Sequence, residues 1–69
     1  MVTAFVSKVR RGNYVFLTWK GDHSPRHVHV YREGKFVVKW NLDDRVSMKG
    51  SPTARILRLI AQLEKEGVL

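Results

Sequence analysis

The sequence predicts an α+β domain, in which an antiparallel meander of four to five strands precedes one C-terminal α-helix packed on one sheet face. Three observations support this class. Short runs rich in β-branched and aromatic residues fill residues 5–42, and turn-forming residues separate them. Apolar residues recur at helical spacing only near the C-terminus. With 69 residues, 43% of them hydrophobic and 28% charged, the chain fits one globular domain over residues 1–69.

Residues 5–10 and 14–19 form the first expected hairpin. The second of these segments, YVFLTW, consists almost entirely of strand-favouring residues. The intervening RGN, residues 11–13, contains a Gly-Asn pair typical of tight turns. Gly21 and Pro25 then interrupt the extended chain, so we expect a bend before the next strand.

The third and fourth expected strands are residues 27–31 (HVHVY) and 35–42 (KFVVKWNL), joined by REG at residues 32–34. The acidic residues of DDR, residues 43–45, indicate another turn. Residues 46–48 are a possible short fifth strand. These segments are close in sequence, which favours antiparallel neighbours in one sheet.

The register of the second hairpin depends on its loop. A three-residue loop ending in glycine suits a type I turn with a bulge, which sets Val30 opposite Phe36 and Val28 opposite Val38. One face then carries Val28, Val30, Phe36, Val38 and Trp40, and the other carries His27, His29, Tyr31, Val37 and Lys39. A two-residue turn would mix these faces, because a slip of one residue inverts a strand.

The helix is expected over residues 52–66, with Ser51 as N-cap, Pro52 as first helical residue and Gly67 as the stop signal. Ile56, Leu59, Ile60 and Leu63 form its apolar stripe, which is expected to pack on the sheet with Trp19 and Trp40. The opposite side carries Arg55, Arg58, Gln62 and Lys65. A charged helix face of this kind is usually solvated.

The charge balance indicates an anionic partner. Thirteen basic residues against six acidic ones give a net charge of +7 and a pI near 10.4. Such a balance attracts nucleic acid, or an acidic partner protein. The chain has no cysteine, signal peptide or membrane-spanning run, which fits a cytoplasmic protein that does not enter membranes. Because so short a chain has a small core, a homo-oligomer is possible.

Three histidines lie within residues 22–31. His27 and His29 are two apart on a strand and therefore point to one face, whereas His23 precedes the bend at Pro25. RNA cleavage without a metal needs a base, an acid and positive charge near the phosphate, and histidine can serve as acid or base. The candidate catalytic residues are His27, His29, Tyr31 and His23, and the candidate nucleic-acid-binding residues are Arg10, Arg11, Arg26, Arg32 and Lys39.

Other interpretations of these residues stay open. His23, His27 and His29 could together bind zinc, although their spacing matches no specific zinc motif. They could equally be exposed strand and turn residues, or part of a face that docks a partner without chemistry. Tyr14, Phe16 and Tyr31 could form a stacking surface for bases. Phosphate-loop, dinucleotide and paired-carboxylate motifs are missing, so we expect no cofactor.

A longer pattern resembles a known bacterial family. It runs W-x2-D-H-x-P-x-H-V-H-V-Y, then Gly34, then L-x3-V-x3-G-x-P, then a helix containing RILRLI. This resembles the family known as domain of unknown function 4160 over residues 12–66. The family usually has a second proline at Arg26 and often phenylalanine at Val28. Its members are small proteins of bacteria and phages, whose genes commonly lie beside that of another small domain in candidate toxin–antitoxin pairs.

These observations together predict a small basic protein of a toxin–antitoxin-like pair that acts on or binds RNA. The leading activity is that of a metal-independent endoribonuclease. The first alternative is a non-catalytic binding module for nucleic acid or for an acidic partner protein encoded nearby. The second is a zinc protein with histidine ligands.

Overall fold

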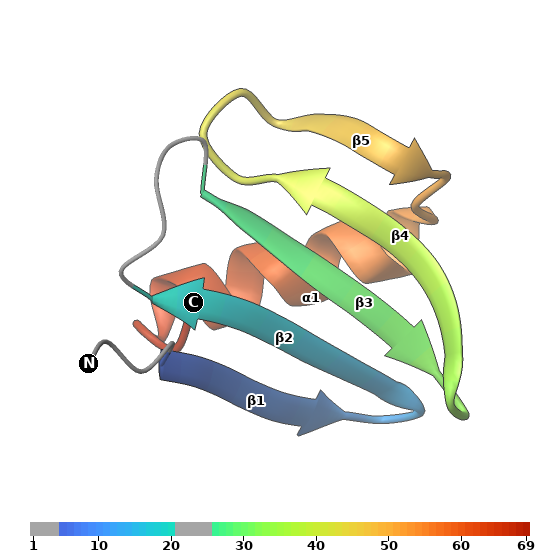
Figure 1. The fold of residues 1–69 in the computed structure, drawn as a ribbon, viewed down its shortest axis with the longest axis horizontal. Coiled ribbons are helices and arrows are strands. Elements are labelled where there is room, and N and C mark those ends of the chain that lie inside the picture. The colour runs from blue at the N-terminus through green and yellow to red at the C-terminus, as the bar shows by residue number, and fades with distance from the viewer. Residues whose placement is uncertain (1–4, 21–25) are drawn as a thin grey trace.

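The chain forms a five-stranded antiparallel sheet with one helix on one side (Figure 1). The computed structural model describes the backbone of residues 5–20 and 26–69 and the side chains of residues 7–18 and 26–69. The elements in chain order are β1 (Phe5–Arg11), β2 (Tyr14–Lys20), β3 (His27–Arg32), β4 (Lys35–Asn41), β5 (Val46–Gly50) and α1 (Ala54–Lys65). Each strand pairs with the next along the chain. The predicted α+β meander followed by a helix is confirmed.

The core lies between the sheet and α1. Phe16, Val28, Val30 and Val38 are fully buried on the helix side of the sheet. Ile56, Ile60 and Leu63 meet them from α1, which lies behind the central strands in Figure 1. The predicted apolar stripe of the helix is therefore confirmed, and Trp40 also belongs to this core. The predicted core position of Trp19 lies outside the described side chains.

The helix begins later than the sequence suggested. Its N-cap is Thr53, not Ser51, and the Thr53 hydroxyl oxygen accepts a hydrogen bond from the backbone N–H of Ile56 at 3.2 Å. Because β5 continues to Gly50, the chain needs residues 51–53 to leave the sheet, and Pro52 lies in this connection. The other end matches the prediction, since Gly67 adopts a left-handed φ of 81° just after the helix.

The register predicted for the β3–β4 hairpin is wrong. The turn contains two residues, Glu33 and Gly34, with φ of 50° and 80°, as in a type I′ turn. Val30 pairs with Val38, where Phe36 was expected, and Val28 pairs with Trp40, where Val38 was expected.

A bulge explains how the two-residue turn keeps the valines inside. Tyr31 pairs with Phe36, and the next pair is Val30 with Val38, so Val37 is the extra residue. The bulge shifts the following residues by one position, which returns Val38 to the buried face. Phe36 lies before the shift and is 40% exposed. It is therefore a surface residue, and its predicted place in the core is wrong.

The β4–β5 turn is built around Asn41, a buried polar residue that ends β4 one position before the predicted Leu42. The side-chain oxygen of Asn41 accepts hydrogen bonds from the backbone N–H groups of Asp43 and Asp44 at 2.9 and 2.8 Å. Such Asx hydrogen bonds reverse the chain. The predicted turn and fifth strand are thus confirmed, and the strand extends to Gly50.

Candidate functional site

The sheet face opposite α1, here called the outer face, gathers the candidate site residues. Strand alternation and ring contacts assign to it Lys8, Arg10, Val15, Leu17, His27, His29, Tyr31, Phe36, Lys39 and Lys49. None of the five strands contains an acidic residue. The described acidic residues lie in turns or in α1 and its C-terminal turn. The outer face is therefore a basic and aromatic surface that the helix leaves uncovered (Figure 1).

The histidine pair lies near the middle of this face. The ring centroids of His27 and His29 are 5.2 Å apart and the rings meet edge to face at 79°. Both side chains are half-buried. The prediction that they share one face is confirmed, because the buried Val28 separates them in β3.

The surroundings of His29 favour its neutral form. Across the sheet His29 pairs with Leu17 on one side and Lys39 on the other. Burial, then the charges of His27 and Lys39, lower the pKa of His29 below its ordinary value of 6.5. Its Nδ1 atom is buried and has no hydrogen-bond partner among the described residues. A neutral imidazole at pH 7 can accept a proton, which is the requirement for a general base.

Aromatic rings continue the face toward the β3–β4 turn. Tyr31 and Phe36 contact each other edge to face, with ring centroids 5.8 Å apart at 77°. The ring of His29 lies 6.4 Å from that of Phe36. The ammonium group of Lys49 lies 5.9 Å from the centroid of the Phe36 ring. Sequence reasoning missed Phe36 because it assumed a longer turn, although Glu33-Gly34 is compatible with a two-residue one.

Like charges lie opposite each other in the same region. Lys39 pairs directly with Lys49 across β4 and β5, and Lys39 also pairs with His29. Like charges in directly opposite positions destabilise a sheet. Lys49 was not among the predicted site residues, because its place beside Lys39 follows from the pairing of β5.

The predicted nucleic-acid-binding residues divide into two groups. Arg10 and Lys39 lie on the outer face with the histidines and Tyr31. The other three do not join them. Arg11 alternates onto the helix side and forms an ion pair with Glu66 at 2.5 Å, which lowers the pKa of that carboxyl. Arg32 occupies a helix-side position opposite Tyr14.

Arg26 precedes β3 and binds the β4–β5 turn. Its backbone N–H donates to one carboxylate oxygen of Asp43 at 2.9 Å, and its Nε donates to the other at 3.1 Å. These hydrogen bonds lower the pKa of Asp43. The backbone N–H of Leu42 also donates to the carbonyl of Arg26 at 2.8 Å. Arg26 therefore connects the start of β3 to this turn.

The predicted stacking surface is only partly present. Tyr14 and Phe16 are 8% and 0% exposed and belong to the core, so their predicted contact with bases is wrong. They alternate with Val15 in β2, and alternation places them under the helix. Tyr31 lies on the outer face as expected, and Phe36 supplies the second ring there.

The zinc hypothesis stays a prediction. Within the described residues, no group of three potential ligands from histidine, cysteine, aspartate and glutamate is close enough to bind a metal ion. His23, the third histidine of that hypothesis, lies outside the described residues.

Comparison with known proteins adds the family. A family model described as a domain of unknown function, DUF4160, matches residues 12–66. The chain belongs to this family. Searches of curated proteins and of solved structures gave no significant match. In this DUF4160 protein the matched segment runs from the first hairpin turn to the end of α1, so it includes most of the outer face. Among the described residues, no helix has the length and apolar character needed to cross a bilayer.

Proposed function

We propose that the outer face binds single-stranded RNA. The observation that carries this proposal is the pairing of Lys39 with Lys49, beside His29 and the aromatic pair of Tyr31 and Phe36. Open sheets that bind RNA combine cationic side chains for the phosphates with rings that stack on bases. The outer face offers both kinds of side chain on strands that the helix does not cover.

Electrostatics supports a polyanionic ligand. Lys39 and Lys49 repel each other in the free protein, and a phosphate between them would replace repulsion by attraction. Three of the five described acidic side chains are engaged elsewhere, because Asp43, Glu64 and Glu66 form ion pairs with Arg26, Arg45 and Arg11. The positive charge of the outer face therefore remains available to a phosphate backbone, and binding should weaken steeply with salt.

Removal of the exposed ring tests the stacking contribution. We expect Phe36→Ala to weaken binding of a fluorescein-labelled uridine decamer by about 5-fold or more, because one stacked base is worth about 1–3 kcal/mol. The matched control is Val46→Ala, which removes another exposed apolar side chain, 52% exposed on β5. Fluorescence polarisation in low salt measures both. Equal affinity of the two variants and the wild type would contradict stacking, and absence of binding by the wild type would contradict the proposal.

RNA cleavage is a second candidate, favoured by the environment of His29. The neutral imidazole would remove the proton from a 2′-hydroxyl, whose oxygen then attacks the adjacent phosphorus. The bond to the 5′-oxygen breaks, and that oxygen takes a proton from a second group, for which His27 or Tyr31 is the candidate. A 2′,3′-cyclic phosphate and a 5′-hydroxyl result. Lys39, opposite His29, would stabilise the charge that develops on the phosphoryl oxygens.

Cleavage by the pure protein in EDTA tests this chemistry without metal ions. We expect His29→Ala and His27→Ala each to lose at least about 100-fold in rate, the usual contribution of acid–base catalysis. Arg58→Ala, on the exposed side of α1, is the control for a general loss of charge. If the histidine variants cleave as fast as the wild type, the chemistry comes from elsewhere, and if the wild type does not cleave, the protein is a binding module.

The cellular role that we propose is the basic member of a cytoplasmic toxin–antitoxin-like pair. It rests on membership of the DUF4160 family and on the net charge of +7, which also suits an acidic partner protein. Expression in a bacterial host, with and without the neighbouring gene, tests it. Growth arrest that the neighbour relieves is the expected result, whereas unchanged growth in both cases would refute a toxin.

A further inference from the structure

One line of side chains crosses the whole outer face from edge to edge. Each of its members pairs directly with the next, and in strand order they are Lys8, Leu17, His29, Lys39 and Lys49. We call this line the cationic row. It contains three lysines and one histidine, and β2 alone contributes an apolar side chain to it. Because β1 and β5 are the two edge strands, the row is open at both ends.

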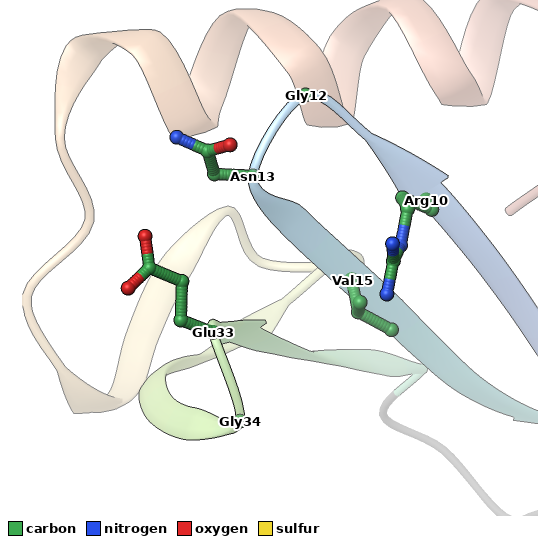
Figure 2. A pocket seen from close by; sticks show the side chains of 6 residues that line it. All are labelled: Arg10, Gly12, Asn13, Val15, Glu33 and Gly34. Atoms are coloured by element: carbon green, nitrogen blue, oxygen red, sulfur yellow. The ribbon is translucent and has the colours of Figure 1, made fainter.

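A second line lies beside the cationic row, on the side of the hairpin turns. Arg10 pairs with Val15, Val15 with Tyr31 and Tyr31 with Phe36, and we call these four residues the ring row. Figure 2 shows its β1 end, where Arg10 and Val15 lie together beside a cavity of about 160 Å³ between the hairpin tips. The carboxylate of Glu33 points away from both of them. The ring row therefore keeps the positive charge of Arg10 at one end and the aromatic pair at the other.

Lys8 belongs to the cationic row, although it is not among the residues that the sequence indicated for nucleic-acid binding. Its direction is fixed by its neighbours in β1. The hydroxyl of Ser7 donates a hydrogen bond to the carbonyl oxygen of Val68 at 3.2 Å, and Val9 packs against the core. Both side chains therefore point to the helix side, and strand alternation directs the exposed Lys8 to the outer face.

The lysines of the cationic row keep their charge available. No ion pair joins Lys8, Lys39 or Lys49 to an acidic side chain in the described part of the chain. The ion pairs found there are made by arginines, namely Arg11, Arg26 and Arg45. Lys8 and Lys49 are exposed, so a phosphate can reach both ends of the row from solvent.

The two rows set the direction in which a nucleic acid can bind. Among the described side chains, no single strand places more than two lysines or arginines on the outer face, whereas the cationic row has three. The rows also match the two parts of a nucleotide chain, because phosphates need cations and unpaired bases need rings. A chain that crosses the strands therefore meets both kinds of side chain along its whole path.

The spacing of the strands sets the length of the bound segment. Neighbouring strands lie about 4.8 Å apart, so the four intervals from β1 to β5 measure about 19 Å. At the stacked rise of roughly 3.4 Å per nucleotide, this length corresponds to about six nucleotides. A more extended chain needs fewer, and the smallest sites for single strands cover about four nucleotides.

We propose that the outer face binds a segment of about four to six unpaired nucleotides that crosses the strands, with Lys8 and Lys49 contacting phosphates at its two ends. This inference rests on the proposed RNA binding and defines the form of RNA that the face accepts. In a duplex the bases are stacked inside the helix, so they do not reach Tyr31 and Phe36. A dinucleotide is too short to contact both ends of the cationic row.

The effect of Lys8→Gln on RNAs of two lengths tests this path. Fluorescence polarisation in about 50 mM salt should show a labelled uridine octamer binding about 5- to 10-fold more weakly, as expected for one lost phosphate contact. The slope of log K against log salt should fall by about 0.7. A uridine trimer cannot span the row and is held by Lys39, Lys49 and the rings, so its affinity should change less than about 2-fold. The matched control is Lys65→Gln on α1, which should leave the octamer slope unchanged.

The outcomes separate this path from RNA binding itself. If Lys8→Gln affects the octamer no more than Lys65→Gln does, the path across the strands is refuted and RNA binding by the outer face stands. An equal loss for trimer and octamer would also refute it, because Lys8 would then not mark a distant end. Absence of trimer binding by the wild type would support the required length. If the wild type does not bind the octamer in low salt, the proposed function fails and the path fails with it.

Discussion

Gly50 holds the edge strand against its neighbour, and its replacement by alanine should loosen β5. A Cβ atom at Gly50 would lie 2.2 Å from the carbonyl oxygen of Val37 and 3.1 Å from the Cα of Val38. Both obstacles are backbone atoms, so no side-chain rotation can relieve the contact. Gly50 also has a φ of 80°, where an L-residue is strained. Two separate penalties therefore act on Gly50→Ala.

The matched control is Gly34→Ala, because Gly34 has the same φ of 80° but no atom within 4 Å of an added Cβ. The left-handed conformation costs alanine about 1–2 kcal/mol at either site. The steric contact adds about 1–3 kcal/mol at Gly50 alone, as in other overpacked sites. The total of about 2–5 kcal/mol is a large share of the roughly 3–10 kcal/mol expected for a domain of this size.

Thermal unfolding followed by circular dichroism measures the difference between the two variants. Since 1 kcal/mol lowers the Tm of a small domain by about 4–8 °C, Gly50→Ala should melt at least about 4 °C below Gly34→Ala. It should also bind RNA less well, because displacement of β5 moves Lys49 away from Lys39. Equal Tm values for the two variants would show that the close approach of Gly50 to β4 is not a constraint on the fold.

Three further predictions concern charge, titration and capping. Lys49→Gln should reduce the salt dependence of RNA binding by about one ion, because one phosphate contact is lost, and an unchanged salt slope would show that Lys49 makes no such contact. Its effect on stability should be small, since relief of the repulsion with Lys39 is offset by loss of the cation–π contact with Phe36. Because the pKa of His29 is lowered in the folded protein, this histidine takes up a proton more readily in the unfolded chain as the pH falls. The free energy of unfolding should therefore fall as the pH drops below 6.5. Urea unfolding at about pH 7 and at about pH 5 should show a smaller fall for His29→Gln than for the wild type. Equal pH dependence would rule out a depressed pKa. Thr53→Ala should lower the free energy of unfolding in urea by about 1 kcal/mol, because it removes the N-cap hydroxyl, whereas Ser51→Ala should lower it by less than about 0.5 kcal/mol. A larger loss for Ser51→Ala would show that Ser51 is the N-cap.

The histidine face shows how much of the site the sequence could predict. Strand alternation is a local property, so HVHVY was enough to place His27 and His29 together and Val28 inside. The partners of the face were harder to find. Lys49 lies on this face because β5 pairs with β4, which the local sequence does not show. Arg11 does not lie on it, because strand alternation directs its side chain to the helix side, where it pairs with Glu66.

The predicted stacking role of Tyr14 and Phe16 was wrong for a related reason. Tyr14 and Phe16 have the composition of a stacking surface, but composition does not say which side of β2 the helix will cover. Once α1 packs on that side, both rings are removed from solvent. The same argument explains the late start of the helix, because Ser51 can be a cap only if β5 ends before it, and β5 continues to Gly50.

The sequence by itself determined the order of the elements, the apolar stripe of the helix and the division of β3 into an apolar and a histidine side. These features depend on residue periods of two and 3.6, which any window of the chain displays. Tertiary structure decided the register of the second hairpin. The two-residue turn at Glu33 and Gly34 would have exposed Val38, and burial of that valine under α1 is achieved by the bulge at Val37. Phe36 lies between the turn and the bulge, so the two-residue turn places it opposite Tyr31 on the outer face. The aromatic pair of the candidate site therefore comes from the turn, and the bulge returns Val38 to the core without moving that pair.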